Sequence, residues 1–501
     1  MKKTIALLLV LLLVIAATPA ALAARAEEGR QNSYTMDFVL DTENKALNGT
    51  FDILAVNDSE DEWEELCLRD FAMAVIQELD GNWLLKDKTK FKSVTSVDTG
   101  NELEIRFDKD DASIVFVELE QALAPGESTA ISIDFYADIP ESSMRYSWNK
   151  SPDEELLMFE LANFYPLLAI YEDGDWVCDE YVTDGEAFYS RCANYSVKMT
   201  LPEEYTVVAS GDEQVSGDGN GMAEWSIEAQ NMRDIYITAS NNFSCVSDSW
   251  EGVEFNSYYF TEGYEDYNPK GNAEVMLKAA MDSMEFFTEM VGPYPYDELD
   301  LVIMSGMVGG MEYPSIVKMS NVKNYYDAYG GMFDEYGEED YGFNVDEMVE
   351  QALIEVTAHE VGHQWFYAVV GSDSYNEAWL DEGITSFITM MFTMRDATAM
   401  DMANMVKYSM EWLEEDVGDR YINESYGELD YDYGTVVYMK GQYFMYELMQ
   451  AMGEESFLEM FRDYYQTWSF KEASTKDFVQ KVYEYDDSDE VKELIEKYIK
   501  L

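Results

Sequence analysis

Residues 359–363 read His-Glu-Val-Gly-His and contain the two histidines of the 501-residue chain. On a helix, positions i and i+4 share one face, so His359 and His363 would lie side by side. Two neutral imidazoles in this arrangement bind one Zn²⁺, and Glu360 is placed to face a water on the metal. The spacing therefore predicts a zinc helix with Glu360 as its acid–base residue.

The alternative is that both histidines belong to the core of an amphipathic helix. Leu353, Val356 and Phe366 give residues 345–370 an apolar face with a helical period. A buried histidine needs a hydrogen-bond partner, but that role does not require the chain's two histidines to stand four residues apart. The metal site is therefore the favoured interpretation.

A catalytic zinc needs a third protein ligand and one open position. Two carboxylates downstream are candidates, Glu377 and Glu382, within the stretch 376–383 (NEAWLDEG). Glu382 lies 19 residues after His363 on what reads as a following helix, which an antiparallel arrangement would bring to the metal. Spacing alone does not separate the two carboxylates.

Three motifs in this order resemble the aminopeptidase N type of gluzincin zinc peptidases, the membrane alanyl aminopeptidase family. They are HEVGH followed by Trp-Leu-Asp-Glu-Gly at 379–383, Gly-Gly-Met-Glu-Tyr at 309–313, and Tyr-Met-Lys-Gly at 438–441. The resemblance covers roughly residues 34 to 501. It implies one Zn²⁺ per chain and selects Glu382 as the third ligand beside His359 and His363.

The resemblance also implies roles for residues around the metal. Tyr438 would donate a hydrogen bond to the oxyanion that forms during peptide hydrolysis. Glu312 would bind the α-ammonium group of the substrate, and Gly309, Gly310 and Met311 would line the substrate groove. The expected activity is a zinc aminopeptidase that removes N-terminal residues from peptides.

This sequence departs from the family pattern in three places. Tyr313 stands where the family usually has Asn, and the β domain has no clear match to the Gln or Glu that shares amine binding. The chain ends about sixty residues after Tyr438, so we expect the large C-terminal superhelical domain to be absent. A zinc endopeptidase of the thermolysin-like group is therefore the alternative. A non-catalytic binding protein is disfavoured because Glu360 and every expected ligand are present.

The sequence pattern changes from strand-like to helical near residue 246. Before it, short runs such as 34–40, 113–119 and 195–200 alternate in the manner of strands and are separated by turn signals. After it, helical patterns dominate, beginning at 273–291, where Gly-Pro follows. We expect an α+β protein, with an N-terminal antiparallel β domain (30–246) and a thermolysin-like, mainly helical zinc catalytic domain (247–501).

Other segments carry weaker expectations. Residues 1–23 resemble a cleaved signal peptide, with Lys2 and Lys3 before an uncharged run that is too short to span a bilayer. No later run is long enough either, so we expect a secreted protein with no stable membrane span. The polar, Tyr- and Gly-rich stretch 325–346 reads as a solvated surface insertion.

The formal net charge of −69 excludes two classes of partner. A surface this negative repels phosphate backbones and anionic lipids, so we expect no nucleic-acid partner. Peptide substrates are what the family resemblance implies. The sequence does not indicate an oligomeric state.

Export would permit disulfides among the four cysteines. These are Cys67, Cys178, Cys192 and Cys245, and four cysteines allow three pairings. Cys178–Cys192 is weakly favoured because these two flank a polar turn. Four buried free thiols are an equal alternative.

Overall fold

The computed structural model describes residues 31–81, 88–141, 145–151, 156–182, 185, 188–217, 219–304, 309–336 and 344–501. The expected signal peptide, residues 1–23, lies outside these ranges. Within them, no helix combines the length and the apolar composition that a bilayer crossing requires.

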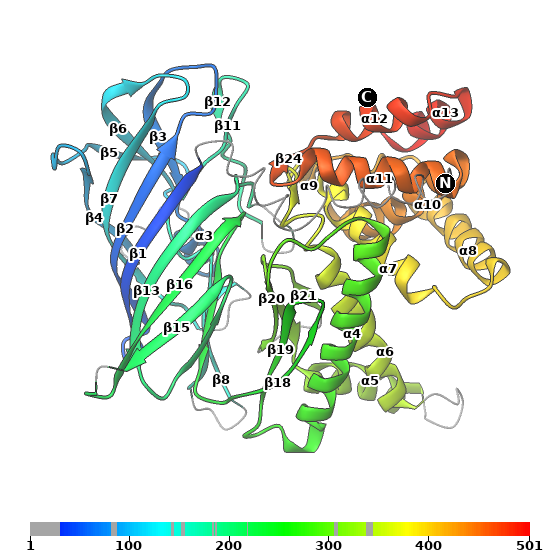
Figure 1. Ribbon diagram of the computed structural model, residues 1–501, viewed down its shortest axis with the longest axis horizontal. Helices are drawn as coiled ribbons and strands as arrows, with labels where there is room; N and C mark the ends of the chain where they lie inside the picture. Colours follow the sequence, from blue (N-terminus) through cyan, green and yellow to red (C-terminus); the bar gives the residue numbers. More distant parts are fainter. Residues whose placement is uncertain are drawn as a thin grey trace, which may run out of the picture.

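The N-terminal half consists of β-sheets, drawn in blue to green in Figure 1. The largest sheet has the strand order β15 (Asp212–Gly217), β16 (Met222–Met232), β13 (Ala193–Pro202), β1 (Asn32–Asp41), β2 (Ala46–Val56), β7 (Ser128–Asp138) and β4 (Thr89–Ser96). A second sheet has the order β10 (Leu167–Leu168), β3 (Trp63–Arg69), β6 (Ile114–Leu123) and β5 (Ile105–Phe107). A third has the order β14 (Thr206–Ala209), β17 (Tyr236–Ser240), β9 (Leu156–Ala162) and β8 (Tyr146–Lys150). The hairpin β11 (Tyr171–Glu172) and β12 (Asp175–Trp176) and one helix, α3 (Phe71–Asp80), complete this half.

Strand β1 shows why these segments are strands. Its side chains alternate between the core and the outside, and Tyr34, Met36 and Phe38 are all buried. β1 pairs with β2 in antiparallel fashion but with β13 in parallel, which places Tyr34 opposite Tyr195. Their rings stack with centroids 5.0 Å apart. The expectation of a wholly antiparallel domain is therefore wrong at this pair of strands.

The C-terminal half combines a five-stranded sheet and a two-stranded sheet with many helices (Figure 1). The five-stranded sheet has the order β18 (Phe243–Trp250), β19 (Val253–Phe260), β20 (Glu298–Met304), β22 (Ile316–Ser320) and β21 (Gly310–Met311). The helices are α4 (Pro269–Met290), α5 (Val322–Tyr336), α6 (Val345–Gly362), α7 (Glu382–Thr393), α8 (Ala399–Val417), α9 (Tyr426–Leu429), the π-helix Thr435–Lys440, α10 (Gly441–Met452), α11 (Glu454–Trp468), α12 (Thr475–Tyr485) and α13 (Asp489–Tyr498). Two short strands, β23 (Val370–Gly371) and β24 (Lys471–Glu472), pair in parallel. A β half followed by a mainly helical half confirms the expected α+β fold class.

Helix α4 ends as the sequence predicts. Pro269 opens it at the first helical position, and its last residue is Met290. Gly292 follows with a φ of +155°, and a Cβ there would lie 2.8 Å from the ring of Tyr465. The carbonyl of Gly292 also accepts a hydrogen bond of 2.8 Å from Nε1 of Trp365. The turn after α4 is therefore packed against the segment that follows the zinc helix.

Residues 325–336 belong to the stretch that was expected to form a solvated surface insertion, and the structure shows that they are helical. They belong to α5, and Tyr325 is 1% exposed. Tyr325 and Tyr329 are four residues apart on one helix face, with ring centroids separated by 6.4 Å. Asp327 and Ala328, between these two tyrosines, are exposed, so one face of this part of α5 is solvated. Residues 337–343 of the same stretch lie outside the described ranges.

The four cysteines do not pair as expected. Cys178 lies beside Cys67, with 3.4 Å between the two Sγ atoms, whereas Cys192 is buried with its Sγ 4.0 Å from the carbonyl of Ala368. All four are free thiols, and Cys245 is exposed. The Cys178–Cys192 pairing is therefore wrong, because the polar turn between these residues does not bring them together.

Candidate active site

Helix α6 presents the two histidines as their spacing requires. Asn344 caps its N-terminus by accepting a hydrogen bond from the backbone N–H of Asp346. At the other end, the N–H of His363 donates to the carbonyl of His359 at 3.3 Å, so helical geometry continues through both histidines. Their Nε2 atoms lie 3.1 Å apart.

Helix α7 brings a carboxylate to these two nitrogens. Glu382 is its first residue, and Oε2 lies 3.1 Å from Nε2 of His359 and 3.2 Å from Nε2 of His363. Four ligands held about 2.1 Å from a tetrahedral Zn²⁺ are about 3.4 Å from one another. The three atoms thus form a triangle of the size that one zinc ion fits.

Glu377, the competing carboxylate, lies elsewhere. Its Oε1 accepts a hydrogen bond of 3.1 Å from the backbone N–H of Thr475 at the start of α12. Burial raises the pKa of Glu382, but His363 and His359 outweigh burial and hold that pKa well below its usual value. Glu382 is therefore ionised and faces the histidines, whereas Glu377 caps a helix.

Asp381 orients His363 from the side opposite the three ligand atoms. Its Oδ1 lies 2.6 Å from Nδ1 of His363, and the carbonyl of Phe366 and the hydroxyl of Thr385 lie 3.1 and 3.2 Å from the same nitrogen. A proton on Nδ1 leaves the lone pair of Nε2 free for a metal. The sequence motif at 379–383 contains Asp381, but no role was predicted for it. Its position directly before the ligand candidate Glu382 could have indicated one.

Glu360 lies against the edge of the five-stranded sheet. Its side chain is 5% exposed, and a Cβ at Gly310 in β21 would lie 2.3 Å from its Cδ. Only glycine lets the strand approach the carboxylate so closely. Glu360 is thus held between the zinc helix and the strand that continues into Met311 and Glu312.

Tyr438 reaches the site from the π-helix. Its hydroxyl donates a hydrogen bond of 2.6 Å to Oε1 of Glu382, and its ring stacks on His359 with a centroid distance of 6.0 Å. Burial and the charge of Glu382 raise the pKa of Tyr438 well above its usual value, so the hydroxyl keeps its proton. The π-helix, a geometry often found at functional sites, places a protonated donor beside the ligand atoms.

Glu312 is a second buried carboxylate at this site. It is 6% exposed, and one of its oxygens lies within 4.8 Å of an imidazole nitrogen of His363. Burial raises the pKa of Glu312 to about 7, with His363 lowering it and Glu382 raising it. A carboxylate with so little water around it gains from a cationic partner.

The neighbouring departure from the family pattern has a structural reason. The ring of Tyr313 stacks on Tyr236 of β17 with centroids 4.7 Å apart, and its hydroxyl accepts a hydrogen bond of 3.5 Å from Arg145. Tyr236 and Arg145 belong to the N-terminal half. Tyr313 therefore packs at the junction of the two halves rather than at the metal.

The ligand triangle, Glu360, Tyr438 and Glu312 open into one cleft of about 820 Å³. Every predicted site residue lines it: Gly309, Gly310, Met311, Glu312, His359, Glu360, His363, Glu382 and Tyr438. The cleft also has methionines in its wall, namely Met390, Met394, Met405 and Met439. The structure thus brings together residues that lie on four separate stretches of the sequence.

Residues 275–498 match the model of the Peptidase family M1 domain. This part of the chain is therefore similar to M1 peptidase domains. The matched residues run from α4 to the last turn of α13 and include the histidines, Glu360, Glu382, Glu312 and Tyr438.

Curated relatives match part of the chain. Aminopeptidase 2 of Candida albicans is 24% identical over 44% of this chain and 23% of its own length. Aminopeptidase M1-B of Oryza sativa is 23% identical over 47% of this chain and 26% of its own length. Leukotriene A-4 hydrolase of Xenopus laevis is 25% identical over 42% of this chain and 32% of its own length. The matched part of the chain spans about a quarter to a third of the length of these relatives.

The M1 zinc metallopeptidase of Deinococcus radiodurans has the same fold. With a TM-score of 0.64 at 15% identity, the match covers 94% of this chain and 95% of that protein, so the shared fold includes the N-terminal β half as well as residues 275–498. Together with the ligand triangle, these likenesses indicate a zinc cofactor and support a zinc hydrolase.

Proposed function

We propose that this protein is a zinc aminopeptidase that removes N-terminal residues from peptides, with His359, His363 and Glu382 as the zinc ligands. When bound, zinc supplies a Lewis acid that lowers the pKa of a coordinated water and polarises the scissile carbonyl. The remaining steps belong to side chains of the chain itself.

Glu360 is the proposed general base and acid. Its carboxylate takes a proton from the attacking water and later delivers one to the leaving amine. Tyr438 is the proposed oxyanion donor, because its hydroxyl keeps its proton and lies next to a ligand oxygen. The position of the hydroxyl between Glu382 and the open cleft supports this role.

The position of Glu312 is the observation that favours an aminopeptidase over an endopeptidase. The amine nitrogen and the carbonyl carbon of one residue are about 2.5 Å apart. Glu312 lies within 4.8 Å of His363, so an ammonium group paired with Glu312 places the first peptide bond of the substrate beside the ligand triangle. An internal peptide bond would need the preceding residue in the space where Glu312 stands, which disfavours the endopeptidase alternative.

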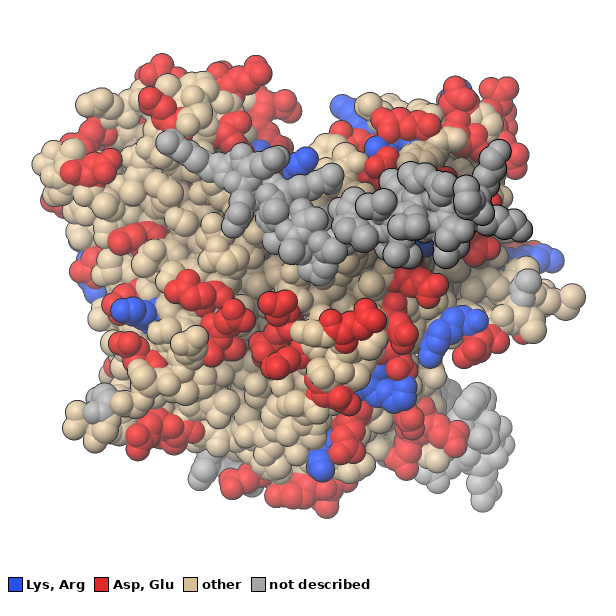
Figure 2. Space-filling model, in the orientation of Figure 1, with Lys and Arg blue, Asp and Glu red and all other residues tan. Residues whose placement is uncertain are grey.

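The negative charge of the surface favours substrates with a cationic N-terminus. Figure 2 shows Asp and Glu side chains over both halves of this face, with few Lys or Arg among them. The net charge of −69 attracts protonated amines at a distance, although salt screens most of this effect. The selective contact is therefore Glu312 rather than the general field.

The direct test compares free and N-acetylated peptides of the same sequence, with and without a zinc chelator. The proposal expects hydrolysis of the first bond of the free peptide, little hydrolysis of the acetylated one, and loss of activity with chelator. Equal cleavage of both peptides at internal bonds would instead establish an endopeptidase. We also propose that the protein acts outside the cytoplasm after removal of residues 1–23, which N-terminal sequencing of the native protein tests.

A further inference from the structure

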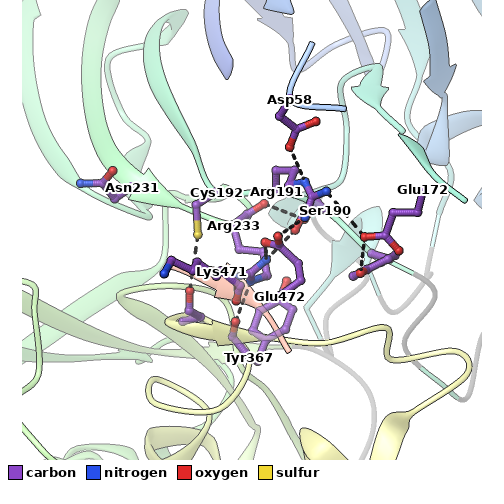
Figure 3. A network of polar contacts seen from close by, with 12 residues as sticks. Asp58, Glu172, Ser190, Arg191, Cys192, Asn231, Arg233, Tyr367, Lys471 and Glu472 are labelled. Atoms are coloured by element: carbon purple, nitrogen blue, oxygen red, sulfur yellow. Dashed lines mark hydrogen bonds and ion pairs between the residues drawn. The ribbon is translucent and has the colours of Figure 1, made fainter. Parts of the chain in front are cut away.

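One arginine of the β half contacts both halves of the molecule: Arg233 donates to the carbonyl of Ser190 at 2.6 Å and reaches residues of the C-terminal half. Arg233 follows β16, and its side chain is 2% exposed (Figure 3). Nε donates a hydrogen bond of 2.8 Å to the carbonyl of Tyr367, and Nη1 lies 2.6 Å from Oε1 of Glu472 in β24. A Cβ at Gly371 would lie 2.1 Å from Cζ of Arg233, so the guanidinium fills the space of a missing side chain.

The carbonyl that Arg233 holds belongs to the loop after the zinc helix. Tyr367 has a φ of +120°, a conformation that residues with a side chain rarely adopt. Its N–H donates to the carbonyl of Val370 at 2.9 Å, and the N–H of Ala368 donates to the carbonyl of His363 at 3.0 Å. The preceding carbonyl, of Phe366, lies 3.1 Å from Nδ1 of His363. Arg233 and His363, a proposed zinc ligand, thus contact the carbonyls of two consecutive residues.

A strained backbone persists only where its surroundings determine it. The guanidinium of Arg233 supplies such surroundings, because its charge is balanced by Glu472 and its planar donors have fixed directions. Arg191 also pairs with Glu472, and with Asp58 at 3.0 Å, but it is 29% exposed. Among the contacts in Figure 3, the one to the Tyr367 carbonyl comes from Arg233.

We propose that Arg233 is a positioning residue for the zinc site, fixing the loop 363–370 and with it the direction of the His363 imidazole. The proposal rests on the zinc site of the proposed function. It gives the β half a role in metal binding although none of its residues is among the proposed ligands.

The test measures zinc affinity by competition with a chelator in wild type, Arg233→Lys and the matched control Arg191→Lys. Lysine keeps the charge of Arg233 but loses the planar fork, so we expect about a tenfold loss of zinc affinity, the lower end of the range for groups that orient metal ligands. With zinc saturating, kcat should fall while KM changes little. Arg191→Lys weakens the same pair with Glu472, and its zinc affinity should stay within about twofold of wild type.

Two further measurements keep the proposal testable if Arg233→Lys does not fold. Gly371→Ala displaces the guanidinium without removing its charge and should lower zinc affinity in the same direction. In the wild type, the amides of Tyr367 and Ala368 should exchange slowly with solvent, because both are hydrogen-bonded within the loop.

The outcomes separate this inference from the proposed function. A wild type that binds no zinc would overturn the proposed function itself. A wild type that binds zinc, with Arg233→Lys and Arg191→Lys lowering thermal stability alike and leaving zinc affinity unchanged, would overturn the positioning role alone. Fast exchange of the Tyr367 and Ala368 amides in the zinc-loaded protein would also overturn it.

Discussion

Nδ1 of His363 and Oδ1 of Asp381 lie 2.6 Å apart, and both side chains are 1% exposed. A carboxylate at this distance fixes the proton of the imidazole on Nδ1 and strengthens Nε2 as a metal ligand. Because the pair is buried, water cannot replace either partner.

Asp381→Asn should weaken zinc binding by about 10–100-fold while leaving the fold intact. The amide keeps the size of the side chain but loses the charge that orients His363. Chelator competition measures the effect. Ser374→Ala is the control, since it removes only a contact of 3.4 Å to the other oxygen of Asp381, and its zinc affinity should stay close to that of wild type. Unchanged affinity in Asp381→Asn would contradict the assigned role.

Zinc content should distinguish the two carboxylates that sequence spacing left open. Glu382→Ala should purify without zinc, because it removes one corner of the ligand triangle. Glu377→Ala should retain zinc and lose some stability, since it removes the contact to the N–H of Thr475. Metal analysis of both variants decides the matter. Retention of zinc by Glu382→Ala together with its loss from Glu377→Ala would show the assignment to be wrong.

Glu360→Gln should keep zinc and lose turnover. The amide fits the space beside Gly310 but cannot accept the proton of the attacking water, so kcat should fall by about 10²–10⁴. Steady-state kinetics with parallel metal analysis measures both quantities. Near-normal turnover at full zinc content is the result that would exclude Glu360 as the base.

The sequence predicts the parts of this site that depend on local spacing. His359 and His363 face one another because four residues make about one helical turn, and α4 ends where Gly292 stands. Glu382 needed a family motif, since spacing alone did not separate it from Glu377.

Contacts between residues far apart in the sequence could not be predicted from the local sequence pattern. Arg233 contacts Tyr367, which lies 134 residues later in the sequence, and no local sequence pattern around either residue predicts this contact. Cys178 similarly meets Cys67 rather than Cys192, because strand packing places β3 beside the segment after β12. The helical structure of residues 325–336 was likewise not predicted, because a Tyr- and Gly-rich composition does not favour a helix.

The stability of the protein should fall as pH rises from about 6 to 8. Burial raises the pKa of Glu213 to about 8 and that of Glu298 to about 7, and the pKa of Asp300 is also raised. Asp212 and Glu254 also face Glu298 and raise its pKa further. The folded state therefore binds more protons than the unfolded chain in this window, so the free energy of unfolding falls as the pH rises, until these carboxyls ionise in the folded state as well.

Urea unfolding at pH 6 and pH 8 measures this dependence. Glu213→Gln should reduce the difference between the two pH values and raise stability at pH 8. Glu224→Gln removes the same charge at an exposed position and should leave the pH dependence unchanged. A Glu213→Gln variant with the full wild-type pH dependence would show that this carboxylate ionises normally in the folded state.

Glu312 should make the enzyme an aminopeptidase. A substrate ammonium group that enters the cleft loses water, and the buried carboxylate of Glu312 is the partner that offsets this cost. Glu312→Ala should therefore lower kcat/KM for free-amine peptides. The corresponding loss of transition-state stabilisation should be about 2–5 kcal/mol, the scale for unpairing a buried charge. Acetylated peptides carry no such charge, so their slow hydrolysis should change little. Glu355→Gln, at an exposed carboxylate that lines the same cleft, is the matched control and should have a small effect on both substrates. If Glu312→Ala lowers cleavage of free and acetylated peptides equally, Glu312 supports the structure of the site and does not select the amine.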